Sequence, residues 1–169
     1  MVDTLKLVKY NDPILHTPCE DWDFTNPPFD LADFSENLVA TMRAENGLGL
    51  AANQVGIPYK IFALESEPTY VVINPKILEL SPEDVELEEG CLSYKGLFVK
   101  VKRPFWIKVR FNYPNGEAGT HRFEGMTARA FLHEFSHIEY GETMLDRLHP
   151  IHREKADRKW KKILRSRKD

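Results

Sequence analysis

The stretch between residues 57 and 111 constrains the fold most, because it contains several short runs of β-branched, aromatic or alternating residues that Pro and Gly separate. Runs of this kind are typical of strands. Strands that follow one another so closely favour a mostly antiparallel sheet. The predicted strands cover Lys60–Leu64, Thr69–Ile73, Gly96–Val101 and Trp106–Phe111.

Helical patterns flank these strands on both sides. Residues Leu31–Glu45 carry apolar side chains at intervals of three or four, and Asp30 precedes them as a suitable N-cap. A second helix is predicted from about Gly125 to Tyr140. A third begins near Pro150 and has an apolar face made by Ala156, Trp160, Ile163 and Leu164.

The length of the chain limits the number of domains. A chain of 169 residues, 42% of them hydrophobic, can bury one substantial core. We therefore predict a single domain over residues 1–169. Strands bounded by helices indicate the α+β class, with a mostly antiparallel sheet packed around a central helix, one helix near the N-terminus and one at the C-terminus.

Composition also bears on the compartment and on partners. No segment approaches the run of about 18 apolar residues that a membrane span needs. The first residues, Met1 to Lys6, lack the basic and apolar regions of a secretory signal. Two cysteines are too few for a disulfide framework, which favours a reducing compartment. We expect a cytoplasmic protein with neither a membrane nor DNA as its partner.

The sharpest local motif is His133-Glu134-Phe135-Ser136-His137, inside the second predicted helix. Helical residues four apart lie on one face, with Cβ atoms roughly 5–6 Å apart. Both imidazoles can therefore bind one cation while Glu134 lies beside it. By itself the motif is equally compatible with a pair of surface histidines.

A second motif, Glu88-Glu89-Gly90-Cys91-Leu92-Ser93, places a lone cysteine in what we expect to be a loop before the strand near Phe98. A thiolate and two imidazoles give three protein ligands and leave one coordination position open. Such an open site is catalytic rather than structural. Taken alone, Cys91 is also compatible with a buried, unreactive thiol.

The third motif runs from Gly47 to Gly56 and consists largely of small residues, with Gln54 among them. Small residues let other groups approach the backbone closely. A nucleotide-binding P-loop is disfavoured, because no Lys-Ser or Lys-Thr pair follows the glycines.

In this order and spacing, the three motifs resemble those of the peptide deformylases: G-hydrophobic-G-L-A-A-x-Q, E-G-C-hydrophobic-S and H-E-x-x-H. The resemblance extends from residue 11 to residue 148. It implies that Cys91, His133 and His137 bind a catalytic metal. It also implies that Glu134 is the general acid/base.

The resemblance implies a reaction and a set of usable metals. Family members remove the N-formyl group from formyl-methionyl nascent peptides and release formate. Fe(II) is the metal expected in the cell, and zinc, nickel or cobalt can take its place in purified protein, since one thiolate and two imidazoles suit all four ions. Gln54 and the backbone N–H of Leu92 are the implied donors to the oxyanion.

Substrate contacts are implied in the first two motifs and on the central helix. Family members hold the methionine side chain in an apolar pocket, which Leu48, Met126 and Ala130 match. They bind the peptide backbone in extended form against a strand edge, which tolerates many sequences. The remaining substrate-binding positions implied are Gly47, Gly49, Glu89 and Gly90.

The C-terminal segment is basic: residues 147–169 hold ten of the 23 Lys and Arg but three of the 26 Asp and Glu. We predict a basic helix over residues 150–169. A charged helix face is commonly just solvated. Because some members of the resembled family dock on the ribosome through a C-terminal helix, ribosome contact is a further hypothesis.

The sequence departs from the family pattern at Ser136 and by one extra residue before Asp146-Arg147, and two other functions share its motifs. Most family members have Asp where this chain has Ser136, so the surroundings of the metal carry less negative charge here. A zinc endopeptidase shares H-E-x-x-H, but Tyr140 replaces its glycine and Met144 does not fit its third ligand, which leaves Glu154 as an alternative ligand. The other rival is a non-catalytic binding module with a structural metal, although retention of Glu134 and Gln54 argues against it.

Overall fold

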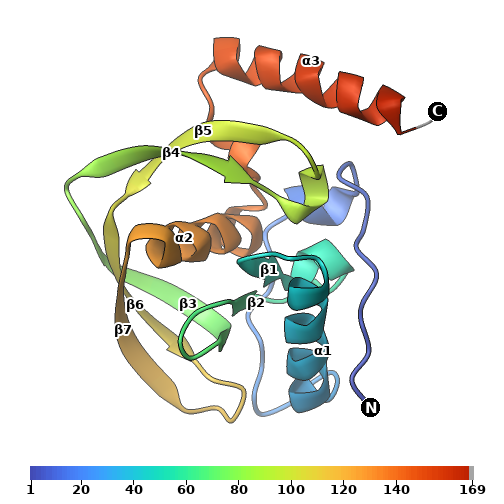
Figure 1. Cartoon of the computed structure of the whole chain (residues 1–169). Coiled ribbons are helices and arrows are strands. Elements are labelled where there is room, and N and C mark those ends of the chain that lie inside the picture. The colour runs from blue at the N-terminus through green and yellow to red at the C-terminus, as the bar shows by residue number, and fades with distance from the viewer. Residues whose placement is uncertain (168–169) are drawn as a thin grey trace.

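In the computed structural model, residues 1–167 are described, and the helix α2 lies between two antiparallel sheets (Figure 1). The α-helices are α1 (Leu31–Ala44), α2 (Gly125–Tyr140) and α3 (Pro150–Ser166). The strands are β1 (Gly49–Ala51), β2 (Ile61–Leu64), β3 (Tyr70–Leu80), β4 (Asp84–Gly90), β5 (Phe98–Pro104), β6 (Trp106–Asn112) and β7 (Ala118–Glu124). The predicted α+β class, with helices near the N-terminus and at the C-terminus, is confirmed.

The two sheets have different sizes and leave two strand edges beside α2. The larger sheet has the order β1-β2-β3-β6-β7, and the smaller one is the hairpin of β4 and β5. All of these strand pairs are antiparallel. Among residues 1–167, strand β1 ends the larger sheet and β4 has β5 as its one partner, so each presents a free edge.

Helix α1 begins where the sequence predicted. The side chain of Asp30 accepts a hydrogen bond from the Asp33 backbone N–H at 3.0 Å and so satisfies a donor of the first turn. Phe34, Leu38 and Met42 are buried along one face, against β1 and β2. The periodic apolar pattern of this segment therefore serves to cover one side of the larger sheet.

Helix α2 is buried on both of its faces. Its apolar side chains, including Phe131 and Ile138, pack into the core formed with β2, β3 and β6. Its polar side chains His133 and Glu134 are buried as well. The hairpin of β4 and β5 covers the side of α2 opposite the larger sheet (Figure 1), and Gly49 of β1 packs against Glu134. The helix ends at Tyr140 and is capped by Gly141, whose φ of 62° is left-handed and whose N–H bonds to Ser136 O.

Helix α3 docks on the outside of the hairpin. Its buried side chains Ala156 and Trp160 belong to a cluster with Tyr94 and Leu97, and Trp160 packs edge-on against Tyr94 at a centroid distance of 5.2 Å. The apolar face predicted for this segment thus packs against the body. Residues 168–169 of the predicted helix lie outside the described residues.

Strands β1, β4 and β7 escaped the sequence prediction, and β3 continues furthest beyond its predicted end. Strand β3 runs from Tyr70 to Leu80 although it contains Pro75, and a register shift occurs there between Ile73 and Lys76. Strand β4 covers the charged stretch before Cys91, for which the sequence predicts no strand. This hairpin strand exposes most of its Asp and Glu side chains, so its sequence lacks the apolar alternation of a half-buried strand.

Two global expectations can be compared with the structure. Cys19 and Cys91 are both buried free cysteines, 7% and 8% exposed. Among residues 1–167, no helix combines the length and the apolar character needed to cross a membrane. The prediction of a single domain over residues 1–169 stays a prediction.

Candidate active site

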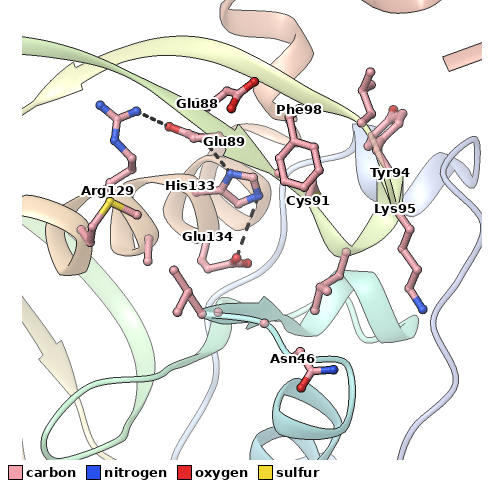
Figure 2. A pocket seen from close by; sticks show the side chains of 18 of the residues that line it. Asn46, Glu88, Glu89, Cys91, Tyr94, Lys95, Phe98, Arg129, His133 and Glu134 are labelled. Atoms are coloured by element: carbon pink, nitrogen blue, oxygen red, sulfur yellow. Dashed lines mark hydrogen bonds and ion pairs between the residues drawn. The ribbon is translucent and has the colours of Figure 1, made fainter. Parts of the chain in front are cut away.

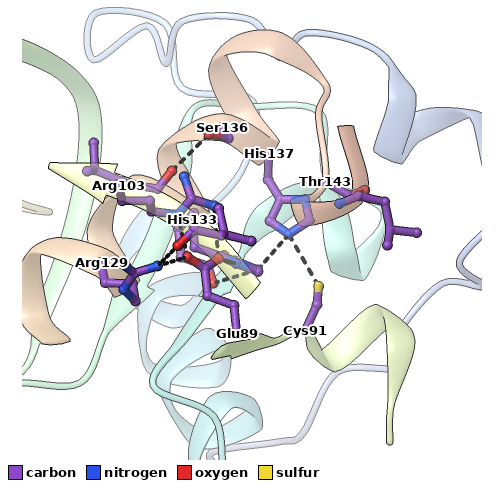
Figure 3. Close-up of polar contacts among 12 residues, drawn as sticks. Glu89, Cys91, Arg103, Arg129, His133, Ser136, His137 and Thr143 are labelled. Atoms are coloured by element: carbon purple, nitrogen blue, oxygen red, sulfur yellow. Dashed lines mark hydrogen bonds and ion pairs between the residues drawn. The ribbon is translucent and has the colours of Figure 1, made fainter. Parts of the chain in front are cut away.

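Two elements bring the three predicted metal ligands together. Cys91 directly follows β4, and its backbone caps the short 3₁₀ helix Leu92–Tyr94, while both histidines lie on α2 (Figure 3). The Cys91 Sγ is 3.5 Å from His137 Nε2, which is 3.3 Å from His133 Nε2. All three donor atoms lie within 4.8 Å of one another and all three residues are buried.

The donor set and its geometry fit a divalent metal ion. A thiolate and two imidazole nitrogens that converge on one point provide three of the four corners of a tetrahedral site. His133 Nδ1 bonds to Glu89 Oε1 at 2.9 Å, which leaves its Nε2 free to face the other two donors. In the described part of the chain, these three residues are the one group of Cys, His, Asp or Glu with such ligand spacing.

Glu89 occupies the centre of a buried ion-pair network around His133. Its carboxylate accepts from Arg103 Nε at 2.5 Å, Arg103 Nη2 at 2.9 Å and Arg129 Nη1 at 2.6 Å, in addition to His133. Burial opposes its ionisation, but the hydrogen bonds from His133 and Arg103 outweigh burial and hold the pKa of Glu89 well below its usual range. Glu89 is therefore a charged, fully bonded anchor for the His133 ring.

The pKa values of the two imidazoles are shifted in opposite directions. Burial disfavours charge on His133, but the negative charge of Cys91 and the hydrogen bonds to Cys91 and Glu89 outweigh it and raise the pKa of His133 to about 10. Burial and the neighbouring His133 hold the pKa of His137 well below its usual range. Because only neutral imidazole binds metal, a cation at this cluster competes with a proton.

Glu134 lies beside the three donor atoms rather than among them. Its Oε1 is 4.0 Å from His133 Nε2 (Figure 2), and its Oε2 is buried and has no hydrogen-bond partner among the described residues. Burial raises the pKa of Glu134 to about 7. A carboxylate with this pKa can both accept and return a proton at neutral pH.

Gln54 turns its amide toward the cysteine. Its Oε1 accepts from the Ala51 N–H at 2.9 Å, and its Nε2 donates to Ser93 Oγ at 3.0 Å and lies 3.6 Å from Cys91 Sγ. The short 3₁₀ helix Ala52–Val55 carries Gln54, directly after β1. The side chain thus connects the first motif to the cysteine motif.

A hollow of about 520 Å³ opens beside these residues, between the free edges of β1 and β4 (Figure 2). Leu48 and Met126 are roughly half exposed on its wall, at 54% and 51%. His137 and Gln54 lie behind the wall and do not line it. The other predicted site residues on its lining are Gly47, Gly49, Glu89, Gly90, Cys91, Leu92, Ala130, His133 and Glu134.

Comparison with known proteins decides the family. The sequence model of the family described as polypeptide deformylase matches residues 4–154. The chain belongs to the polypeptide deformylase family. The predicted family and enzyme class, a metal-dependent hydrolase that removes the N-formyl group from nascent peptides, are thereby confirmed.

Individual relatives agree with this assignment. The peptide deformylase of Thermotoga petrophila is 39% identical over 145 residues, which cover 85% of this chain and 87% of the relative. That of Aquifex aeolicus is 35% identical over 169 residues, covering 96% and 98%. The crystal structure of peptide deformylase from Ehrlichia chaffeensis superposes with a TM-score of 0.85 at 32% identity, covering 99% of this chain and 100% of that one.

The departure from the deformylase pattern at Ser136 has a local explanation. The Ser136 side chain is buried and donates to Leu132 O, one turn earlier in α2, at 3.0 Å. The hydroxyl group of Ser136 therefore finds its hydrogen-bond acceptor on its own helix. Glu89 is left as the carboxylate that both Arg103 and Arg129 contact.

The sequence prediction missed two residues of this deformylase site. Arg129 is 4% exposed and bonds to Glu89, and its position one turn before His133 could have revealed it. Asn53 is fully buried and donates to His137 O at 2.9 Å. No spacing rule points to Asn53, because its partner is a backbone carbonyl 84 residues away.

Proposed function

We propose that this deformylase binds its metal through Cys91, His133 and His137 and uses Glu134 as the general acid/base. The observation that carries this proposal is the convergence of one sulfur and two nitrogen atoms within 4.8 Å, next to a carboxylate and a hollow. Three protein ligands leave a coordination position open toward substrate, as catalytic sites require.

Glu134 moves the protons in the proposed reaction. A divalent cation held by Cys91, His133 and His137 would supply the Lewis acidity needed to activate water and the formyl carbonyl. Glu134 Oε2, which has no partner among residues 1–167, accepts the proton of the attacking water. The same carboxyl then gives this proton to the leaving amine nitrogen, so that formate and a free N-terminus are released.

Gln54 and the backbone N–H of Leu92 are the proposed donors to the oxyanion. Gln54 Nε2 lies 3.6 Å from Cys91 Sγ, so its amide faces the ligand cluster. Fixed donors of this kind stabilise charge that develops in the transition state, and loss of one costs about 100- to 1000-fold in rate. Gln54 also holds the cysteine loop through Ser93, and both roles use the same amide.

The hollow is the proposed peptide site. Met126, Ala130 and Leu48 offer apolar surface to the methionine side chain, and the exposure of Leu48 and Met126 leaves that surface free to be covered. An extended peptide between the free edges of β1 and β4 gains backbone hydrogen bonds that depend little on sequence. Gly49 on β1 and Gly90 on β4 bring no side chain to these edges, and Gly47 lines the hollow just before β1.

Fe(II) is the metal we propose for the working enzyme. The ligand set of one thiolate and two imidazoles suits iron, zinc, nickel and cobalt alike. Zinc, nickel or cobalt in purified protein is therefore compatible with the same site. The resemblance to peptide deformylases supports iron in the cell, and the cytoplasm, where nascent chains appear, is the proposed compartment.

Ribosome contact through α3 is a further part of the proposal. Its lysines 155, 159, 161 and 162 are exposed, and within the described residues none of them has an ion-pair partner. Trp160 on the opposite face holds the helix to the body. These exposed ammonium groups are suited to RNA phosphates near the site where the nascent chain emerges.

The structure does not support the zinc endopeptidase that shares the H-E-x-x-H motif. Glu154, its candidate third ligand, instead forms an ion pair with Arg158 at 3.0 Å on α3. The matched experiment compares formyl-Met-Ala-Ser, acetyl-Met-Ala-Ser and an unblocked peptide with iron-loaded protein in the absence of oxygen. Formate release from the first substrate alone supports the proposal. Cleavage of internal peptide bonds would favour the endopeptidase, and no reaction with any of the three would favour a binding module.

A further inference from the structure

Arg129 connects the two elements that supply the proposed metal ligands. Cys91 is carried by the hairpin of β4 and β5, whereas both histidines are carried by α2. Arg129 stands on α2 one turn before His133, and its side chain crosses to the hairpin (Figure 3). The relative placement of sulfur and imidazoles depends on how these two elements are held together.

The guanidinium of Arg129 makes three hydrogen bonds to the hairpin. Nη1 donates to Glu89 Oε2 at 2.6 Å and to Val101 O at 2.9 Å, and Nη2 donates to Val85 O at 2.6 Å. Val85 lies on β4 and Val101 on β5, so one planar guanidinium group is hydrogen-bonded to both strands. The rigid fork of a guanidinium can satisfy acceptors in several directions at once, which an ammonium cannot do with the same geometry.

Arg103 and Arg129 act on Glu89 from different sides. Arg103 belongs to β5, so its two bonds to Glu89 fix the carboxylate within the hairpin. Arg129 belongs to α2, so its bond ties that carboxylate to the helix that carries His133. The remaining bond, from His133 Nδ1 to Glu89 Oε1, then orients the imidazole ring.

We propose that Arg129 is a positioning residue, which sets the separation of the Cys91 sulfur from the two imidazoles by clamping the hairpin onto α2. The inference rests on the metal role proposed above for these three residues. Arg129 also lines the hollow, but the three acceptors occupy both of its terminal nitrogens. It therefore acts through Glu89 and the hairpin rather than on the substrate.

The test measures Co(II) binding to the metal-free chain by visible absorption, which reports the geometry of sulfur and nitrogen ligands. Arg129→Met retains the apolar stem but loses all three bonds. It should bind Co(II) about 10- to 100-fold more weakly and shift the absorption bands. Arg129→Lys retains the positive charge but not the planar guanidinium. Its Co(II) affinity and absorption bands should lie between those of Arg129→Met and those of the unmodified chain.

A stability control separates positioning from general weakening. Val109→Ala removes buried apolar surface from β6, away from the hairpin, and lowers the thermal midpoint. It should leave Co(II) affinity and spectrum unchanged. If Arg129→Met does not fold, the comparison of Arg129→Lys with Val109→Ala carries the test. An unaltered spectrum and an affinity within twofold in the Arg129 variants would overturn the proposal.

A double-substitution cycle tests whether Arg129 acts through Glu89. In a Glu89→Gln background the charged anchor is gone, so Arg129→Met should weaken Co(II) binding less than it does in the unmodified chain. Equal losses in both backgrounds would contradict action through Glu89. The proposed function fails separately, namely if the unmodified chain binds no Co(II) or releases no formate from formyl-Met-Ala-Ser.

Discussion

Gly49 leaves no room for a β-carbon beside Glu134. A β-carbon built on Gly49 would lie 2.7 Å from the Cγ of Glu134 and 2.9 Å from its Oε1. Strand β1 therefore packs its bare backbone against the carboxyl that we propose as the acid/base. The close approach of Glu134 requires a glycine at position 49, because a larger side chain at this position would displace Glu134.

Gly49→Ala should lower turnover while leaving the metal bound. Displacement of a catalytic group by about 1 Å can cost on the order of 100-fold in rate. We expect a fall of that size in kcat/KM for formyl-Met-Ala-Ser, with metal content near that of the unmodified chain because the ligand residues are untouched. Full activity of Gly49→Ala would contradict the proposed position of Glu134 in the reaction.

Glu89 should make the stability of the metal-free chain depend on acid. Its pKa in the folded chain lies well below the value of about 4.3 expected in the unfolded chain. Its stabilising contribution is thus fully present above pH 4.3 and is lost as pH falls toward the folded pKa. Urea midpoints between pH 7 and pH 3 should fall more steeply for the unmodified chain than for Glu89→Gln.

The matched control for this titration is Glu36→Gln, on the exposed side of α1. Its urea midpoints should follow those of the unmodified chain at each pH. All measurements are made with excess chelator, so that metal release does not contribute. Parallel curves for Glu89→Gln and the unmodified chain would show that Glu89 is not held ionised by the network.

The prominent motifs were predictable because their chemistry is local in sequence. His133 and His137 share one helix and the cysteine motif is contiguous, so each motif could be recognised locally, whereas the family resemblance implied that Cys91 joins the two histidines in one ligand set. Strand β4 was not predictable in the same way, since Glu89 is 6% exposed and its exposed neighbours carry the same charge. Sequence does not distinguish a buried, paired carboxylate from a solvated one; partners such as Arg103, distant in sequence, make that distinction.

Oxygen should inactivate the iron form faster than the nickel form. Fe(II) is oxidised readily, and a cysteine ligand beside it is exposed to the oxidants that result. We expect a clearly shorter half-life in air for iron-loaded protein than for nickel-loaded protein, measured by formate release. Anaerobic storage serves as the control and should abolish the difference. Equal half-lives in air would contradict iron as the special metal of this site.

Reversing the charge of Lys159, Lys161 and Lys162 to Glu should abolish pelleting with ribosomes. All three are exposed on α3, whereas Trp160 on the same helix is buried. If roughly four phosphates are neutralised, the affinity of the unmodified chain should fall with log salt at a slope of about −3. Turnover of a free formyl-tripeptide should not change, because these residues do not line the hollow.

A matched triple variant at exposed lysines of the body, Lys9, Lys76 and Lys108 to Glu, controls for net charge. It should pellet with ribosomes like the unmodified chain. Equal pelleting of the α3 variant and the unmodified chain would mean that α3 is simply a solvated helix. Equal losses in both triple variants would mean that net charge, rather than the face of α3, governs the contact.

Glu134→Gln tests the central claim most directly, because it separates metal binding from proton transfer. Glutamine retains the shape of the side chain but cannot accept the proton of the attacking water. Metal analysis and formate release from formyl-Met-Ala-Ser should be measured on the same sample. The account predicts about one metal ion per chain and no detectable formate. Formate release at the rate of the unmodified chain, or loss of the metal together with the activity, would contradict it.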